Sequence, residues 1–111
     1  MSGYAVKDSG KRQEFESGML REATDDKVNY ALVYDGPMLE RYAAHLTKGA
    51  DKYSKRNWMQ ACTAVELERF REGAARHFAQ WMRGDQDEDH AAAVMFNLNG
   101  YEYVRGRLTS G

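Results

Sequence analysis

The sequence predicts an all-α fold, a small helical bundle that assembles as an oligomer. Apolar residues recur at helical spacing in three segments, and the 111 residues contain a single proline. The hydrophobic fraction of 42% is too high for a disordered chain, whereas the length allows only one small core. We therefore expect one helical domain over residues 27–106, between an N-terminal arm (1–26) and a short tail (107–111).

The first 26 residues are rich in glycine, serine and charges and contain only scattered apolar residues. This composition is typical of an arm that is partly mobile or loosely docked. The following segment, residues 27–33 (KVNYALV), alternates partly like a strand but has no second strand to pair with. We expect it to be an ordered loop.

Two helices are predicted in the middle of the chain. Pro37 after Gly36 favours a helix start, and apolar residues continue at helical spacing until Gly49, which predicts a helix over 37–48. Residues 49–62 are a basic, turn-rich loop with one short helical turn. A T-x-x-E capping box at Thr63 then begins a helix over 64–83, which Gly84 ends; its apolar stripe is Leu67, Phe70, Ala74, Phe78 and Trp81.

A third helix is predicted from the acidic run to about Arg105. The acids at 85–89 favour the positive end of the helix dipole, so we place them in its first turn. The pair Asn99-Gly100 is a turn signal that conflicts with this prediction. A glycine on an apolar helix face more often permits close helix contact, so we expect one continuous helix.

Three polar residues fall on faces where a plain core would be apolar. His77 lies on the apolar stripe of the second helix, and His90 and Asn97 share one face of the third with Ala93 and Gly100. A histidine in such a position is most often a core residue that is hydrogen-bonded to a backbone carbonyl or to another side chain. A buried asparagine without a partner costs about 1 to 3 kcal/mol, so the face forms a polar network or surrounds a polar ligand.

Carboxylates gather in two places that suit a divalent cation such as Mg²⁺ or Mn²⁺. Residues 85–89 offer four carboxylates, but they are not an EF-hand loop, because position six is His90 and position twelve is Phe96. The alternative is a helix terminus with Asp85 or Asp87 as its cap. Glu68 and Glu72, with Arg76 one turn beyond, form either a solvated salt-bridge ladder or a second carboxylate pair of a metal site.

The loop after the first helix combines cations with aromatic rings. Such a loop holds phosphates and stacks a base, or it is a solvated loop whose Trp58 fills the core. The residues concerned are Lys48, Lys52, Tyr53, Lys55, Arg56, Asn57 and Trp58. The single cysteine, Cys62, has no histidine nearby in sequence and receives no role.

Charge and hydropathy exclude several classes of protein. A net charge of −1 and a pI near 6.3 argue against nucleic acid as a partner, and the longest apolar run, residues 91–96, is far shorter than the roughly 20 residues that span a membrane. One cysteine and no signal-like N-terminus indicate a cytoplasmic protein.

Three segments together carry a resemblance to a known family. They are residues 25–33 (DDKVNYALV), 48–58 (KGADKYSKRNW) and 76–100 (RHFAQWMRGDQDEDHAAAVMFNLNG). The chain resembles, over about residues 15–105, the phage and bacterial dATP/dGTP diphosphohydrolases, which are MazG-like members of the all-α NTP pyrophosphatases. It departs from the larger MazG-like group because neither E-E-x-x-E nor E-x-x-D stands intact.

The resemblance implies a metal-dependent enzyme that cleaves a purine deoxynucleoside triphosphate to the monophosphate and pyrophosphate, in phage nucleotide-pool control. It implies Mg²⁺ or Mn²⁺ as cofactor and a homo-oligomer, a dimer or a tetramer. The catalytic roles then fall on Glu72, His77 and Asp89. The metal ligands would be Glu68, Glu72, Asp85, Asp87, Glu88 and Asp89. The substrate contacts would be Lys27, Tyr30, Lys52, Tyr53, Asn57, Trp58, Arg76, His90 and Asn97.

Two other classes remain open at this stage. The chain could be a non-catalytic helical phage protein that binds a protein partner, with the polar stripe fixing the helix register. A nucleic-acid binder that uses the basic loop is weaker, given the net charge of −1.

Overall fold

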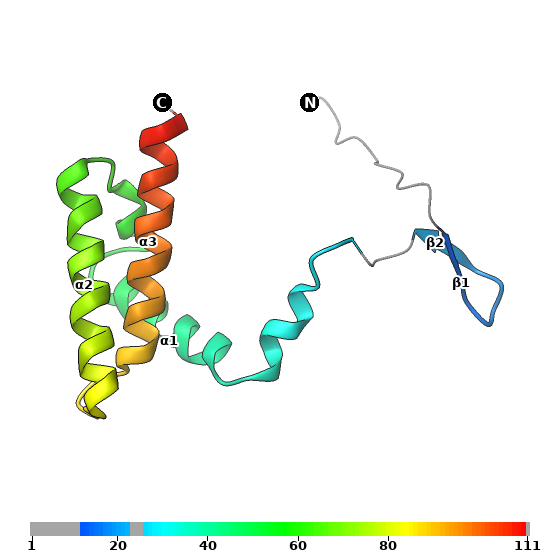
Figure 1. Ribbon diagram of the computed structural model, residues 1–111, viewed down its shortest axis with the longest axis horizontal. Coiled ribbons are helices and arrows are strands. Elements are labelled where there is room, and N and C mark those ends of the chain that lie inside the picture. The colour runs from blue at the N-terminus through cyan, green and yellow to red at the C-terminus, as the bar shows by residue number, and fades with distance from the viewer. Residues whose placement is uncertain (1–11, 23–25, 111) are drawn as a thin grey trace. The chain divides into compact units, whose positions relative to one another are not determined.

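The computed structural model describes residues 12–22 and 26–110, which form two units divided between Leu32 and Val33. Each unit is described by itself. Helices account for most of the described residues, as the sequence predicts, and the long ones all belong to the second unit (Figure 1). None of the described helices is both long enough and apolar enough to cross a bilayer.

The first unit contains a hairpin that the sequence did not predict. Strands β1 (Arg12–Glu14) and β2 (Leu20–Glu22) pair antiparallel, with Gln13 opposite Arg21. Gly18 adopts a φ of +90° in the connecting turn, a conformation that glycine reaches without steric cost. Part of the predicted arm, residues 1–11 and 23–25, lies outside the described residues. The hairpin lies inside the predicted arm, and its strands are too short and too exposed to show an apolar alternation in the sequence.

A short 3-10 helix, η1, spans Tyr30–Asp35, where the division between the units falls. It begins inside the segment predicted as ordered loop. Asn29 supports its start, because its side-chain oxygen accepts a hydrogen bond from the Ala31 amide at 3.1 Å. No residue of η1 is buried.

Helix α1 spans Met38–Lys52 and so runs past the predicted end at residue 48. Gly49 does not stop it, because Gly49 and Ala50 are half-buried and continue the covered face of the helix. Pro37 stands before the helix as its N-cap rather than as its first residue. The helical turn predicted in the following loop is η2, Asn57–Gln60.

Helix α2 spans Ala64–Arg83, which confirms the prediction. The capping box at its start is complete: the Glu66 amide donates to Thr63 Oγ1 at 3.2 Å, and the Thr63 amide donates to the Glu66 carboxylate at 3.1 Å. At its other end Gly84 adopts a φ of +82°, and the Asp85 amide reaches back to the Gln80 carbonyl at 3.1 Å. This is a Schellman ending, which turns the chain sharply toward the next helix.

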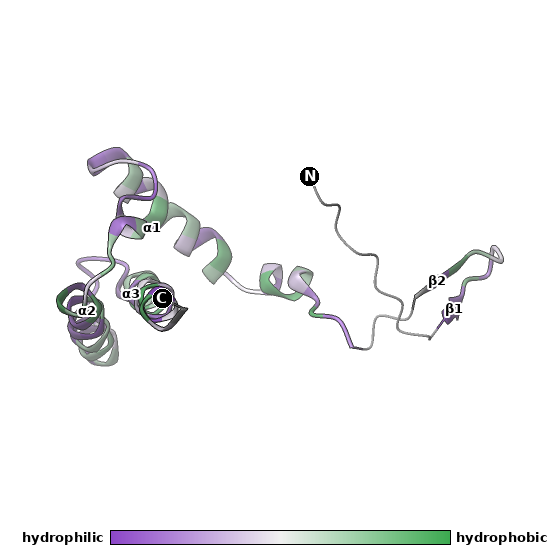
Figure 2. Cartoon of the chain, turned by 90° about the horizontal axis from the view of Figure 1, so that it is seen from above, coloured by the Kyte–Doolittle hydropathy of each residue, from purple (hydrophilic) through white to green (hydrophobic). Residues whose placement is uncertain are grey.

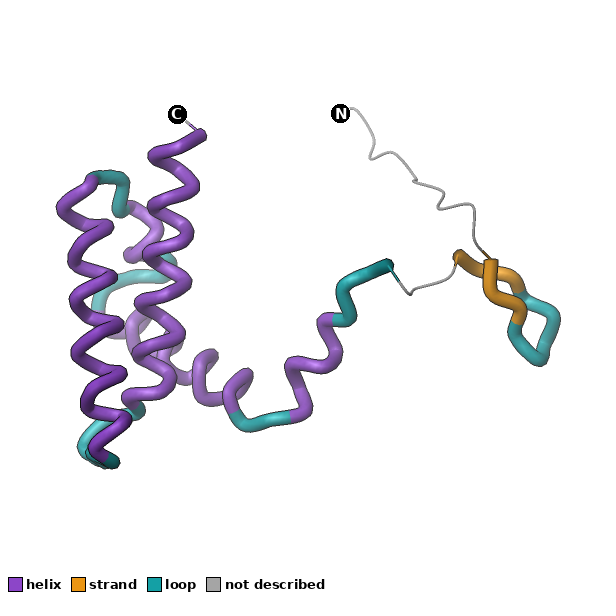
Figure 3. The backbone as a smooth tube through the Cα atoms, in the orientation of Figure 1, coloured by secondary structure: helices purple, strands orange, loops and turns teal. Residues whose placement is uncertain are grey.

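Helix α3 spans His90–Ser110, so the predicted start near 85 and end near 105 were both wrong. The acidic run is the connecting loop rather than the first turn (Figure 3). Neither Asp85 nor Asp87 caps the helix; Asp89 does, since its Oδ1 accepts a hydrogen bond from the Ala92 amide at 3.0 Å. The helix passes through Asn99-Gly100 without a break, as predicted, and its last turns include residues predicted as tail.

Helices α2 and α3 lie antiparallel and side by side, and their contact is the main packing of the second unit (Figures 1 and 2). Glycines allow this approach. A Cβ on Gly73 would lie 2.5 Å from Asn97 Oδ1, and a Cβ on Gly100 would overlap the ring of Phe70. The fully buried residues on α3 are alanine and valine, with His90 among them. Small side chains therefore set the distance between these helices.

An aromatic cluster around Phe96 attaches α1 and η2 to this pair. The Phe96 ring centroid lies 5.2 Å from that of His45 on α1, 6.2 Å from Trp58 on η2 and 6.0 Å from Phe70 on α2. Arg107 adds a tie, because its guanidinium donates to the Met59 carbonyl at 2.7 Å. Trp58 is half-buried and packs edge-on against Phe96, so it takes part in this packing.

Gly100→Ala should lower the free energy of unfolding by about 1 to 3 kcal/mol, because the new methyl group must displace the Phe70 ring from a packed interface. Gly106→Ala is the matched control on the same helix: no atom lies within 4 Å of its Cβ position, so the better helix propensity of alanine should leave stability equal or up to about 1 kcal/mol higher. Urea unfolding followed by circular dichroism measures both. Equal changes in the free energy of unfolding for the two variants would contradict the close approach of α2 and α3 at Gly100.

Candidate metal centre and adjoining pocket

The contact between α2 and α3 is polar at one point, where two histidines face each other. The Nδ1 atoms of His77 and His90 lie 2.9 Å apart, and the ring centroids are 5.2 Å apart. His90 is only 2% exposed, whereas His77 is half-buried. The two histidines that the sequence placed on the second and third helices therefore face each other across the contact of α2 and α3.

Asp87, in the acidic loop, determines which ring nitrogen of His90 carries the proton. Its Oδ1 lies 2.7 Å from His90 Nε2, and a carboxylate accepts hydrogen bonds but does not donate them. His90 Nε2 therefore carries the proton and donates it. In a neutral ring the lone pair is then on Nδ1, the atom that faces His77. The same contact lowers the pKa of Asp87, chiefly through the hydrogen bond from His90.

The surroundings of His77 favour its neutral form. Burial lowers its pKa most, and the nearby charges of Arg76, His90 and His45 lower it further, against an opposing effect of Glu88. A neutral imidazole retains one nitrogen lone pair and can act as a metal ligand.

Two sets of potential ligand atoms meet at this point. His77, Glu88 and His90 each offer one atom within 4.8 Å of the others, and so do Asp85, Asp87 and His90. Nitrogen and carboxylate oxygen in such a cluster can hold a divalent metal ion. Asp85 also pairs with Arg83 at 2.6 Å.

Only part of the predicted metal set is in this cluster. Within the part of the chain that the structure describes, the two sets of ligand atoms include Asp85, Asp87 and Glu88 but not Glu68, Glu72 or Asp89. Glu68 and Glu72 are exposed on α2.

Asp89 stabilises the start of α3 through hydrogen bonds. Arg41 on α1 donates to both of its oxygens, from Nε at 2.8 Å and from a terminal nitrogen at 2.6 Å, while Oδ1 also caps α3. The hydrogen bond from Arg41 lowers the pKa of Asp89 to about 2. This bidentate pair joins the start of α3 to α1.

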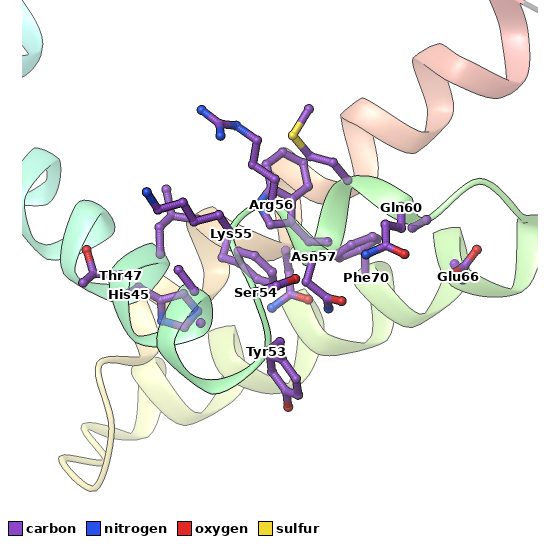
Figure 4. A pocket seen from close by; sticks show the side chains of 18 of the residues that line it. His45, Thr47, Tyr53, Ser54, Lys55, Arg56, Asn57, Gln60, Glu66 and Phe70 are labelled. Atoms are coloured by element: carbon purple, nitrogen blue, oxygen red, sulfur yellow. The ribbon is translucent and has the colours of Figure 1, made fainter.

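A pocket of about 970 Å³ adjoins the helix pair, between the end of α1, the basic loop, η2 and the first half of α2. Figure 4 shows His45 and Thr47 at one end of it and Glu66 at the other, with the loop residues from Tyr53 to Asn57 between them. The size suits a small organic molecule such as a nucleotide.

Of the nine predicted substrate contacts, four line this pocket and five do not. Those lining it are Tyr53, Asn57, Trp58 and Asn97. Lys52 instead lies over the Tyr53 ring, 5.3 Å from its centroid, and Arg76 is exposed on α2 beside His77. Lys27 and Tyr30 belong to the first unit, so they are not among the residues that the structure brings together here. The ninth, His90, is in the metal cluster rather than in the pocket.

The pocket also contains His45 and Arg69, which were not indicated as site residues from the sequence, and Arg56, which was indicated only as a member of the basic loop. Arg56 is the only described residue other than glycine with a positive φ, 59°, a conformation that is uncommon outside functional or tight turns. His45 had a visible signal, because it follows Tyr42 by three residues and so shares the covered face of α1. Arg69 had none.

The pocket and the metal cluster both involve helix α3. Asn97 lines the pocket and lies two helical turns after His90, which belongs to the cluster. His45, which also lines the pocket, has its ring 5.2 Å from that of Phe96 on α3. No described residue of the cluster lines the pocket, so the two are separate features on one helical scaffold.

A helical scaffold with a histidine-carboxylate cluster beside a basic, aromatic pocket defines a protein suited to bind a divalent metal and a small polyanion. A comparison with protein families is more specific: the chain belongs to the family described as dATP/dGTP diphosphohydrolase, N-terminal, whose model matches residues 17–103. The match includes most of the described residues of both units and confirms the resemblance found in the sequence. No curated protein matched the chain, and no solved structure matched it.

Arg41→Met should lower the melting temperature at pH 7 by about 2 to 5 °C, because the tie between α1 and the cap of α3 is lost. Asp89 has a lowered pKa, so its stabilising effect is complete above about pH 4 and is lost as the pH falls through about 2. The difference in melting temperature between the variant and the wild type should therefore become smaller as the pH falls from about 4 to about 2. Arg105→Met, which breaks the exposed pair with Glu102 within α3, is the control and should change the melting temperature less.

Proposed function

We propose that the protein hydrolyses a purine deoxynucleoside triphosphate, dATP or dGTP, to the monophosphate and pyrophosphate. Water would attack the α-phosphorus, the bond between the α-phosphorus and the bridging oxygen would break, and pyrophosphate would leave. The family to which the chain belongs is named for a dATP/dGTP diphosphohydrolase, which supports this reaction class. Control of a nucleotide pool, in phage infection, is the role that we attach to it.

The observation that carries the proposal is that a basic, aromatic pocket and a histidine-carboxylate cluster both involve helix α3, where Asn97 of the pocket lies two turns after His90 of the cluster. A triphosphate needs a site for its base and sugar and, a few ångströms away, positive charge for its phosphates. The aromatic and amide side chains of Tyr53, Asn57 and Trp58 suit the nucleoside. The cations Lys55, Arg56 and Arg69 in the same pocket suit the phosphates.

The acidic loop supports a requirement for a divalent ion, Mg²⁺ or Mn²⁺. When bound, such an ion neutralises phosphate charge and lowers the pKa of a coordinated water, which makes a nucleophile available at neutral pH. Asp85, Asp87 and Glu88 are the predicted carboxylates that the structure gathers near the histidine pair. Asp89, by contrast, would keep the start of α3 and the loop in place.

The purified protein should release pyrophosphate from dATP or dGTP in the presence of Mn²⁺ or Mg²⁺, and EDTA should abolish the activity. Glu88→Gln should reduce turnover by roughly two orders of magnitude, because Glu88 is an exposed carboxylate of the cluster and its loss affects the ion rather than the fold. Glu102→Gln, an exposed acid far along α3, is the control and should retain full activity. Release of orthophosphate instead of pyrophosphate would contradict the proposed bond cleavage.

We also propose that the protein assembles as a homo-oligomer. The sequence placed Phe78 and Trp81 on the buried stripe of α2, yet both are 51% exposed, with their rings stacked 5.8 Å apart, and Met82 beside them is 65% exposed. Adjacent exposed apolar side chains of this size commonly mark a protein interface. The same patch also favours the alternative function, a non-catalytic protein that binds a different protein partner.

Sizing chromatography with light scattering distinguishes a homo-oligomer from a protein that binds a different partner. The wild type should have a mass of at least twice 12.7 kDa at micromolar concentration, and a Phe78→Ser, Trp81→Ser double variant should shift toward the monomer, because the apolar contact is removed. Val65→Ser, also on α2 and 71% exposed but distant from the pair in sequence, should not. A monomeric wild type with no nucleotide hydrolysis would favour the partner-binding alternative.

A further inference from the structure

The histidine pair can be understood in two ways, as a hydrogen bond or as two ligands of one ion. As shown above, the proton of His90 is on Nε2, where it is donated to Asp87, so Nδ1 of His90 presents a lone pair toward His77. In the absence of an ion, His77 Nδ1–H can donate to that lone pair. With an ion between them, both Nδ1 atoms can present lone pairs to the same point.

The spacing of the two nitrogens suits coordination. Metal–nitrogen bonds of about 2.1 Å that subtend an angle near 90° place the nitrogens about 3.0 Å apart. The two Nδ1 atoms lie 2.9 Å apart. The distance between the two nitrogens is therefore compatible with both of them binding one ion, once the rings turn so that their lone pairs converge on it.

The surroundings of the pair are those of a metal-ligating histidine. Such a histidine commonly donates its second ring N–H to a carboxylate, which fixes the ring and increases its basicity, and Asp87 does this for His90. Glu88 supplies a carboxylate oxygen within 4.8 Å of both histidines. Gln80, three residues after His77 on α2, has a buried Oε1 with no hydrogen-bond donor among the described residues.

We propose that His77 and His90 are direct ligands of the divalent ion, with Glu88 as the third, and that Asp87 orients His90 rather than binding the ion itself. Two imidazole nitrogens favour a first-row transition metal such as Mn²⁺, Co²⁺ or Zn²⁺ over Mg²⁺, which prefers oxygen ligands. The ion is the one that the proposed hydrolysis requires, so this inference rests on the proposed function for its biological role.

This assignment gives three residues roles that differ from those the sequence suggested. His77 becomes a ligand rather than an acid or base, His90 a ligand rather than a substrate contact, and Asp87 a positioning residue. Two imidazole nitrogens would thus take the place of some of the carboxylate ligands that the sequence predicted.

Metal binding to the full chain, stripped with EDTA and without nucleotide, tests the proposal. Isothermal titration calorimetry should give an affinity for Mn²⁺ or Zn²⁺ at least about 100-fold higher than for Mg²⁺. His77→Gln should weaken transition-metal binding by about 10- to 100-fold, and Asp87→Asn should weaken it by about 10-fold through loss of ring orientation. His45→Gln, the only other histidine of the chain, is the control for adventitious histidine binding and should retain the affinity.

A spectroscopic measurement identifies the ligands without turnover. Co²⁺ bound to the wild type should show visible absorption bands that move or disappear in His77→Gln and persist in His45→Gln. Equal affinities for Mg²⁺ and Mn²⁺, unaffected by His77→Gln, would overturn the inference and leave the histidines as a hydrogen-bonded pair. In that case His77→Gln should instead lower the melting temperature of the metal-free protein.

The two proposals can fail separately. Nucleotide hydrolysis that is supported by Mg²⁺ and survives His77→Gln would refute the histidine ligands and leave the proposed function standing. Tight transition-metal binding that depends on His77, without hydrolysis of any nucleoside triphosphate, would refute the function and leave the metal site standing.

Discussion

The close approach of α2 and α3 is the constraint on which the rest of the second unit depends. Gly73 and Gly100 remove side chains where Asn97 and Phe70 need space, so that the two helices can pack along their length. Only at this separation can a histidine on one helix come within 2.9 Å of a histidine on the other. The aromatic cluster around Phe96 and the pocket beside it are arranged on this pair, so packing and chemistry share one cause.

The long helices could be predicted because their signals are local. The capping box at Thr63 and the glycine at Gly84 act within a few residues of themselves, and α2 has the predicted bounds. The C-terminal end of α1 and both ends of α3 could not be predicted from local signals, because tertiary contacts determine where these helices begin and end. Burial of Gly49 extended α1, and Arg41, 48 residues away from Asp89, holds the residue that caps α3. The hairpin has strands of three residues, too short for periodicity to reveal.

The candidate site was predictable in composition but not in assignment. Histidines and asparagine on apolar faces indicated a polar network, and the structure places them on the facing sides of α2 and α3. Which acids gather there depends on the path of the acidic loop, which no spacing rule describes. Glu68 and Glu72 have helical spacing like that of known sites yet lie exposed, whereas Glu88 is brought to the histidines because a loop, not a helix, carries it.

The connection between α2 and α3 is fixed at both ends, by the Schellman ending at Gly84 and by the cap at Asp89. An added or deleted residue would force the loop to change its path or one ending to move along its helix, and each residue of such a move turns the helix by about 100°. His90 would then leave the line of His77. In the divergence of such sequences, this segment should therefore tolerate substitutions between its two anchors while its length stays constant, a pattern opposite to that of ordinary surface loops, which vary most in length.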